Sequence, residues 1–459
     1  MRQRVDMTLD PSQPHPAVSL KRRMLAGGAW VFFGKGVTVL CTLVNEALLA
    51  RMLGQEGYGV YVIAFSLVSV ASVVAQLGLH HAAVRFVAES LGLSQPGRAR
   101  ETLRLVYRWA VVGGVCVFVV MIAGPGALLV ERLWDAPELA ASIGSLAVWS
   151  VLISFQVITS ESFRGFKDLR FAALFGGAVT GVLNVSLLTL IYLGWGHTTI
   201  GVVIRVIVVA AALSLGIGLL VLYRLHAGKL PVERGSLSNA ELFDVAAPLW
   251  AIVVVNNMLA HADRWILGAF LTKAEVGIYG AAARLVLLVS QPLILINLLV
   301  PPYIAELYAK GEKRRLEKIL RQTAALAGIP AILILFAFIF FGGPILGTFY
   351  PDAYSAGATI LAILSVSKVV NVLTGSSGIT MAMTGHQHIL MRIAVGVSGM
   401  SIVLCYFVAQ RFGSIGVAIV VSAGSSVVFL LQWLATKKYT GIWTHPAIPS
   451  IEQLKNLFR

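Results

Sequence analysis

The chain has 459 residues, of which 58% are apolar and only 12% are charged. No soluble core needs so much apolar sequence, so the composition excludes a soluble protein and indicates one embedded in a membrane. The net charge of +15 does not point to nucleic acid as a partner, because the basic residues gather between apolar runs and act mainly as an orientation signal.

The first half of the chain predicts six membrane spans after a polar N-terminal segment, residues 1–27. Each span is an apolar run of about 20 residues, which is enough to cross the hydrocarbon of a bilayer. The predicted spans are residues 28–50, 58–79, 109–130, 140–161, 171–193 and 201–223. They define an N-lobe, residues 28–223.

The second half repeats this organisation after a linker, residues 224–244. Its predicted spans are residues 245–270, 277–300, 324–341, 357–382, 393–410 and 416–435. They define a C-lobe, residues 245–436, which is followed by a tail, residues 437–459. Within the tail, residues 451–458 have the spacing of a short surface helix, and a frayed end is equally compatible with them.

The two halves also resemble each other in sequence. Residues 57–68 match residues 275–286 at a spacing of 218, and residues 86–89 match residues 303–306 at a spacing of 217. Six helices separate the copies, an even number, so both halves enter the membrane from the same side. The predicted fold is an all-α integral membrane protein of about twelve helices, in two parallel six-helix repeats around a central cavity, as in transporters.

The basic clusters predict the orientation of these helices. They lie at residues 21–23, 98–108 and 310–321, and Lys and Arg are retained on the cytoplasmic side during insertion. We therefore expect a multi-pass protein of the cytoplasmic membrane with both termini in the cytoplasm.

Several cations lie inside predicted spans, where a charge must face water, a partner or a ligand, and four of them are singled out. They are Lys35, Arg205, Arg284 and Lys368. Arg205 is about one turn from its helix end, so we expect its side chain to reach the interface. For the other three we expect a cavity that binds substrate, with a structural ion pair as the alternative.

Polar residues at helical spacing extend from these cations. The stripes are Lys35, Thr38, Thr42 and Asn45; Asn257, His261 and Arg264; Arg284 and Gln291; and Ser365, Lys368, Asn371 and Gly375. Such stripes either hold helices together by hydrogen bonds or line a polar path. Glu46 is the acidic residue well inside a span, and both a private ion pair and a coupling role are open to it.

An interior lined by uncompensated cations predicts an anionic ligand where the two halves meet. A sugar chain carried on a lipid diphosphate fits this prediction. Its head cannot cross hydrocarbon unaided, because each unpaired polar group costs several kcal/mol there, whereas its lipid tail can remain in the bilayer.

Several segments resemble the polysaccharide-export, or oligosaccharide flippase, family of the multidrug, oligosaccharidyl-lipid and polysaccharide exporter superfamily. They are residues 50–61, 76–79, 84–89, 262–268 and 276–279. The resemblance implies a V-shaped pair of lobes that moves a polyprenyl-diphosphate-linked oligosaccharide to the outer leaflet by alternating access, for surface polysaccharide biosynthesis. It also implies coupling to H⁺ or Na⁺, no organic cofactor, and a polysaccharide polymerase and glycosyltransferases as partners.

Two other classes of function were compared with this one. A multidrug antiporter of the same superfamily usually carries cations and would need an acidic cavity, which these residues do not predict. A membrane enzyme that polymerises lipid-linked sugars would need acid–base groups outside the membrane, yet the longest external segment, residues 342–356, holds one acid, Asp352, and no base. The sequence also contains no nucleotide-binding motif, and His386 and His388 lack further metal ligands nearby.

Overall fold

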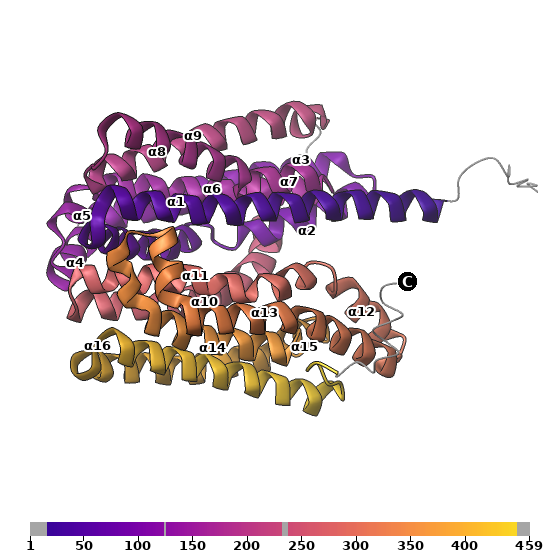
Figure 1. Ribbon diagram of the computed structural model, residues 1–459. Helices are drawn as coiled ribbons and strands as arrows, with labels where there is room; N and C mark the ends of the chain where they lie inside the picture. Colours follow the sequence, from indigo (N-terminus) through magenta and orange to yellow (C-terminus); the bar gives the residue numbers. More distant parts are fainter. Residues whose placement is uncertain (1–15, 124, 232–236, 448–459) are drawn as a thin grey trace, which may run out of the picture.

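The computed structural model describes residues 16–123, 125–231 and 237–447, and within these ranges it contains helices and no strands. The helices form two bundles (Figure 1). The N-lobe, α1 to α9, lies above the C-lobe, α10 to α16, and α1 runs beside their boundary. The all-helical two-lobe fold predicted from the sequence is confirmed. The predicted helix at residues 451–458 and the first 15 residues lie outside the described ranges.

The N-lobe is built mainly from long apolar helices. Its elements are α1 (Pro16–Ala75), α2 (Leu79–Gly92), α3 (Pro96–Ile122), α4 (Pro125–Trp134), α5 (Pro137–Ala141), α6 (Ile143–Gly165), α7 (Leu169–Ala173), η1 (Leu174–Ala178), α8 (Val179–Trp195), α9 (Ile200–Leu225) and η2 (Ala227–Lys229).

The C-lobe repeats the pattern of a long helical pair followed by further spans. Its elements are α10 (Asn239–Phe270), α11 (Lys273–Asn297), α12 (Pro301–Ala309), α13 (Lys313–Phe349), η3 (Asp352–Gly357), α14 (Ala358–Thr374), α15 (Ser377–Met383) and α16 (Gln387–Thr440).

Ten of these helical segments are long and apolar enough to cross a membrane, and two of the ten fold back on themselves. In α1 the Tyr58 hydroxyl donates to the Glu46 carboxylate at 2.7 Å, although a continuous helix would separate the two residues by about 18 Å. The chain reverses between them at Gly54, whose φ of 68° suits glycine.

The long helix α16 reverses in the same way at Gly413, where φ is 59°. A Cβ placed on Gly424 would lie 2.1 Å from the Ser401 hydroxyl, whereas a straight helix would hold the two residues about 34 Å apart. With these two reversals the described chain contains twelve membrane-length segments, as the sequence predicts.

Several helix boundaries differ from the prediction, and in two of them apolar sequence continues past the point where the helix ends. The third span ends at Ile122, and α4 follows as a separate helix. The tenth ends at Thr374, because Gly375 takes a φ of 68° and the backbone of Thr444 occupies the space where a side chain would be. Helix α10 begins at Asn239, before the predicted span, since the Ser238 hydroxyl caps it there.

The two lobes approach each other closely at one end of the bundle, called here the hairpin end because it carries Gly54 and the turn between α10 and α11. A Cβ on Gly59 would lie 1.7 Å from the Lys273 carbonyl oxygen, and one on Gly277 would lie 2.5 Å from that of Gln55. Gly59 and Gly277 are equivalent positions of the repeat. The lobes therefore meet through the same small-residue surface of each copy.

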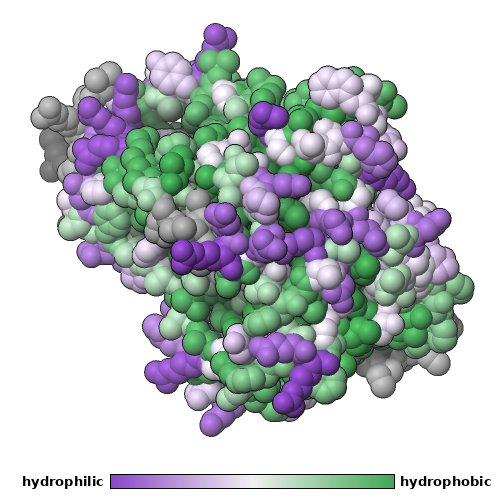
Figure 2. Space-filling view, turned by 90° about the vertical axis from the view of Figure 1, so that its left-hand side faces the viewer, coloured by the Kyte–Doolittle hydropathy of each residue, from purple (hydrophilic) through white to green (hydrophobic). Residues whose placement is uncertain are grey.

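Further contacts seal the hairpin end. The Trp134 indole of α4 donates to the Trp265 carbonyl of α10 at 3.1 Å, and the Lys273 ammonium group donates to the Trp134 carbonyl. The Tyr354 hydroxyl donates to the Gly54 carbonyl at 3.1 Å. Figure 2 views the molecule from the side that carries α4 and α5, where hydrophilic residues lie among apolar ones.

Along one lateral seam, α10 follows the second half of α1 over its whole length. The Trp265 indole donates to the Ser66 hydroxyl at 2.8 Å, and farther along the Trp250 indole donates to the Val73 carbonyl at 3.2 Å. At the far end of this seam, Arg98 of α3 forms an ion pair with Glu241 of α10. This side of the molecule is thus closed from end to end.

Candidate functional site: two polar cavities

A cavity of about 560 Å³ lies between the N-lobe and α11, and is called here the N-cavity. The predicted stripe of α1 lines it with all four of its members, which are Lys35, Thr38, Thr42 and Asn45. Gln156 of α6 and Asn184 of α8 add amide groups, so the wall is polar on several helices.

Glu46 and Arg284 form an ion pair between the lobes at the wall of the N-cavity. The Arg284 Nε lies 2.9 Å from the Glu46 Oε1, and only 2% of the Glu46 side chain is exposed. The carboxylate also accepts the hydrogen bond from Tyr58, and the guanidinium lies 4.3 Å from the ring centroid of Phe65. The prediction that Arg284 is uncompensated was therefore wrong, because Glu46 of the other lobe neutralises it.

Lys35 differs from the other cations of the N-cavity. Arg164 is paired with Glu161 at 2.8 Å, and Arg284 is paired with Glu46. Among the residues that the structure describes, no carboxylate oxygen lies within 4.0 Å of the Lys35 ammonium group. The N-cavity thus holds one cation with no acidic partner in the described chain.

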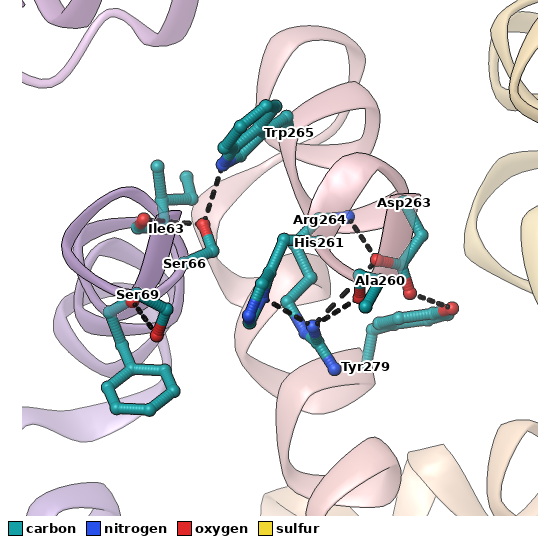
Figure 3. A network of polar contacts seen from close by, with 10 residues as sticks. Ile63, Ser66, Ser69, Ala260, His261, Asp263, Arg264, Trp265 and Tyr279 are labelled. Carbon is teal, nitrogen blue, oxygen red and sulfur yellow. Dashed lines mark hydrogen bonds and ion pairs between the residues drawn. The ribbon is translucent and has the colours of Figure 1, made fainter. Parts of the chain in front are cut away.

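A second cavity of about 410 Å³, called here the C-cavity, lies entirely among C-lobe helices α10, α11, α14 and α16. Lys368, Asp263 and Arg264 supply its charges. Asp263 accepts hydrogen bonds from the Tyr279 hydroxyl and from the Arg264 backbone N–H, both at 2.9 Å. The Arg264 guanidinium turns toward the Ala260 carbonyl and the His261 ring (Figure 3), at 3.1 and 2.9 Å.

The two cavities are built in a similar way. Glu46 beside the N-cavity and Asp263 beside the C-cavity are each a carboxylate that accepts a hydrogen bond from a tyrosine of the following span. Asn184 and Ser401 each line the cavity of their own lobe.

This division corrects the prediction of one chamber lined by all three cations. Lys35 and Arg284 face the N-cavity, whereas Lys368 faces the C-cavity. Helix α11 separates them, since Arg284 lines one cavity and its neighbour Ala283 lines the other. Sequence spacing places a residue on a face of its own helix but does not tell which neighbouring helices enclose that face.

The remaining predicted residues line neither cavity. His261 bonds to Arg264 and lies edge-on to Phe65, with ring centroids 6.4 Å apart. Asn257, Gln291 and Asn371 are partly buried in the helix packing. Arg205 is exposed on α9, which agrees with a side chain that reaches the interface and excludes it from the cavity wall.

Two residues of the site were missed by the sequence analysis. Tyr58 supports Glu46, and Phe65 packs on the Arg284 guanidinium. Tyr58 could have been found, because it lies four residues after the turn at Gly54 and inside the repeated segment. Phe65 carries no such signal, since an aromatic residue in a membrane span usually packs against other helices or lipid.

Known proteins resemble this chain in both sequence and fold. A family described as "Polysaccharide biosynthesis protein" matches residues 24–308, which is more than half of the chain. The chain belongs to this polysaccharide biosynthesis protein family. The membership predicted from residues 50–61 and 262–268 is confirmed, and a second family, MatE, matches residues 248–407.

Curated relatives of this polysaccharide biosynthesis protein cover most of its length. The "Probable flippase AglR" of Haloferax volcanii is 25% identical over 91% of this chain and 82% of its own. The "Putative O-antigen transporter" of Shigella flexneri is 22% identical over 90% of this chain and 98% of its own.

Solved structures share the fold of this family member. An inward-facing multidrug resistance MATE transporter of the MOP superfamily aligns with a TM-score of 0.74 and 15% identity, over 88% of this chain and 94% of its own. The lipid II flippase MurJ in an inward closed conformation aligns with a TM-score of 0.64 and 14% identity, over 89% of this chain and 87% of its own. The fold is therefore that of a membrane transporter with two helical lobes.

Proposed function

We propose that the protein is a flippase, which moves a polyprenyl-diphosphate-linked oligosaccharide across the cytoplasmic membrane for surface polysaccharide biosynthesis. Family membership and relatives named as flippase and O-antigen transporter support this proposal. The observation that carries it is the N-cavity, which presents Lys35 without an acidic partner in the described chain beside hydroxyl and amide groups of several helices.

Lys35 is the residue proposed to hold the diphosphate. A lysine ammonium group offers three donors that can turn toward phosphate oxygens. It lies on one face with Thr38, Thr42 and Asn45. The two threonine hydroxyls donate to backbone carbonyls, so their oxygens can accept from sugar hydroxyls, whereas the Asn45 amide can donate to them. The paired cations Arg164 and Arg284 keep the wall fixed without adding net charge, because Glu161 and Glu46 neutralise them.

The proposed mechanism is alternating access by rocking of the lobes, and no covalent step is involved. The hairpin end is sealed by the approach of Gly59 and Gly277 to the opposite lobe. The lining of the N-cavity extends from the Glu46–Arg284 pair to Arg164, whose side chain is 51% exposed. With the predicted cytoplasmic termini, the hairpin end faces outward and this arrangement is the state that loads substrate from inside.

The remaining parts of the proposal concern energy and partners. We propose coupling to H⁺ or Na⁺, and a polysaccharide polymerase and glycosyltransferases that act on the same lipid-linked sugar. A cationic drug is the weaker candidate cargo, because both carboxylates of the N-cavity wall are paired with arginine and leave no free acid in the described chain to bind it.

Transport by the purified protein tests the proposal. Proteoliposomes should move a fluorescent lipid-diphosphate oligosaccharide from one leaflet to the other, and Lys35→Ala should slow this movement about tenfold or more, because a charge-assisted contact to the diphosphate is lost. Arg205→Ala, which changes an exposed side chain of α9, should move the substrate at the wild-type rate.

The opposite results would reject the proposal in distinct ways. Equal transport rates for Lys35→Ala and the wild type would show that Lys35 does not bind the substrate. Export of a cationic dye by proteoliposomes that leave the lipid-linked sugar in place would favour the drug antiporter.

A further inference from the structure

The C-cavity has no part in the proposed handling of the diphosphate, yet its construction is that of a binding site. It is lined by spans of the C-lobe alone, and its volume of about 410 Å³ falls within the range of roughly 300–1,000 Å³ that is typical of ligand pockets. A charged side chain in the membrane interior costs free energy, so the charges on this wall indicate a functional role.

The charges of the C-cavity leave one positive charge in excess. Lys368 and Arg264 are cationic, and Asp263 is the single acid of the wall. Asp263 is used within the protein, since it accepts from Tyr279 and from the Arg264 backbone and lies 3.9 Å from the Arg264 guanidinium. Among the described residues, no carboxylate oxygen lies within 4.0 Å of Lys368.

The Arg264 guanidinium is also engaged by groups of its own helix. It donates to the Ala260 carbonyl and contacts the His261 ring, and Figure 3 shows both partners on the same helix. Lys368 of α14 is therefore the cation that is left to meet a ligand.

The other groups of the wall suit a sugar. Ser367, Ser398, Ser401, Ser425 and Asn256 surround the cavity with polar oxygens and an amide. Ser367 and Ser401 donate to backbone carbonyls of their own helices, at 2.8 and 2.9 Å, so their oxygens remain able to accept hydrogen bonds from sugar hydroxyls. Phe429 adds an aromatic surface to the same wall.

We propose that the C-cavity binds the carboxylate of an acidic sugar, with Lys368 as its cation, and this rests on the proposed function in taking that sugar to be part of the transported oligosaccharide. One excess positive charge is neutralised by a monoanion. A phosphate dianion would bring a second, unpaired negative charge into a poorly solvated site, which is strongly unfavourable. A small inorganic anion would leave the serine hydroxyls and most of the volume unused.

The proposal gives the two lobes different tasks. The diphosphate binds at Lys35 in the N-cavity, and the acidic sugar binds at Lys368 on the far side of α11. A single substrate would then touch both lobes, and its charges would be read at two separate positions.

Binding to the purified full-length protein in detergent tests this assignment without transport. Thermal unfolding is followed while sodium glucuronate is added, with glucose as the neutral analogue and sodium chloride at matched ionic strength. Glucuronate should raise the unfolding temperature in a saturable manner, and glucose and chloride should not. Lys368→Gln should weaken glucuronate binding about tenfold or more, whereas Lys368→Arg and the exposed-site control Arg205→Gln should retain it.

The contrary outcomes overturn the proposal. It is wrong if glucose or chloride stabilises the protein as well as glucuronate does, or if Lys368→Gln binds glucuronate as tightly as wild type. Should Lys368→Gln fail to fold, Ser425→Leu, which fills the cavity and leaves its charge intact, takes its place and must also weaken binding. Stabilisation by pyrophosphate, measured in parallel and sensitive to Lys35→Gln, tests the proposed function separately.

Discussion

The contact between Glu46 and Arg284 shows how a charge is made tolerable in the membrane interior. Glu46 is buried, receives the Tyr58 hydroxyl and faces the Arg284 guanidinium, which in turn rests on the Phe65 ring. Each polar atom of the carboxylate thus has a partner. Because Arg284 belongs to the other lobe, the pair must break or shift whenever the lobes separate at this level.

Removing one member of this pair should cost more than removing both. Arg284→Gln leaves the Glu46 carboxylate buried without its cation and should destabilise the protein by about 3–5 kcal/mol. The Glu46→Gln/Arg284→Gln double variant should recover most of this loss, because no buried charge remains. Thermal unfolding of the wild type, both single variants and the double variant in detergent measures the coupling. A double variant as unstable as Arg284→Gln would contradict the assigned pairing.

At the residue scale, the sequence predicted that three cations line a cavity, but it did not predict their partners. Lys35, Arg284 and Lys368 all line cavities, and the stripe from Lys35 to Asn45 shares one of them. The partner of Arg284 could not be predicted, since Glu46 is 238 residues away in the sequence and only the packing of α1 against α11 joins them. The same packing divides the predicted single chamber into two cavities.

At the scale of elements, the glycines of α1 and α11 determine how closely the lobes can meet. Neither Gly59 nor Gly277 has room for a side chain, because a backbone carbonyl of the opposite lobe fills the space. The repeated segments noticed in the sequence, residues 57–68 and 275–286, therefore mark the surface on which the two copies touch.

A single methyl group at this contact should open the hairpin end. In Gly59→Ala the added Cβ would lie 1.7 Å from the Lys273 carbonyl oxygen, so the helices must move apart. Spin labels at Arg51 and Thr348, which belong to opposite lobes and contact each other at 3.3 Å, should report a longer distance than in wild type.

The matched control for this variant is Gly216→Ala in α9, where an added Cβ meets nothing within 4 Å. It should leave the label distance unchanged. If Gly59→Ala folds and keeps the wild-type distance between the spin labels, the close approach of the two helices does not determine how far apart the lobes lie at the hairpin end.

The number of membrane segments could be predicted from hydropathy, but their ends could not. Apolar sequence continues from α3 into α4 and from α14 into α15, so hydropathy predicts one long span where the structure has two separate helices. At Gly375 the break depends on a tertiary contact, since Thr444 of the segment after α16 packs against it and its hydroxyl donates to the Thr374 carbonyl at 2.5 Å. Such a contact leaves no periodic signal.

At the scale of the whole molecule, orientation in the membrane decides which end loads substrate. The basic clusters of α3 and α13 predict that the end opposite the hairpin end is cytoplasmic. Single cysteines at Lys310 and Asp352, both exposed, lie between spans at opposite ends of this arrangement and can report the orientation.

We expect the cysteine at Asp352 to react with a membrane-impermeant maleimide in intact cells, and the one at Lys310 to react only after the membrane is opened. The background for this test replaces Cys41, Cys116 and Cys405 by alanine. The opposite labelling pattern would show that the predicted orientation is wrong and that the sealed hairpin end faces the cytoplasm.

The meeting of Gly59 with Gly277 has a consequence for the origin of the chain. Two equivalent positions that touch across a pseudo-twofold axis form the contact that identical subunits make in a symmetric dimer. It is the contact expected if a six-helix unit paired with itself before duplication and fusion joined the two copies. In a fused chain the two halves can change independently. Lys35 and Lys368 occupy non-equivalent helices, which agrees with such independent change.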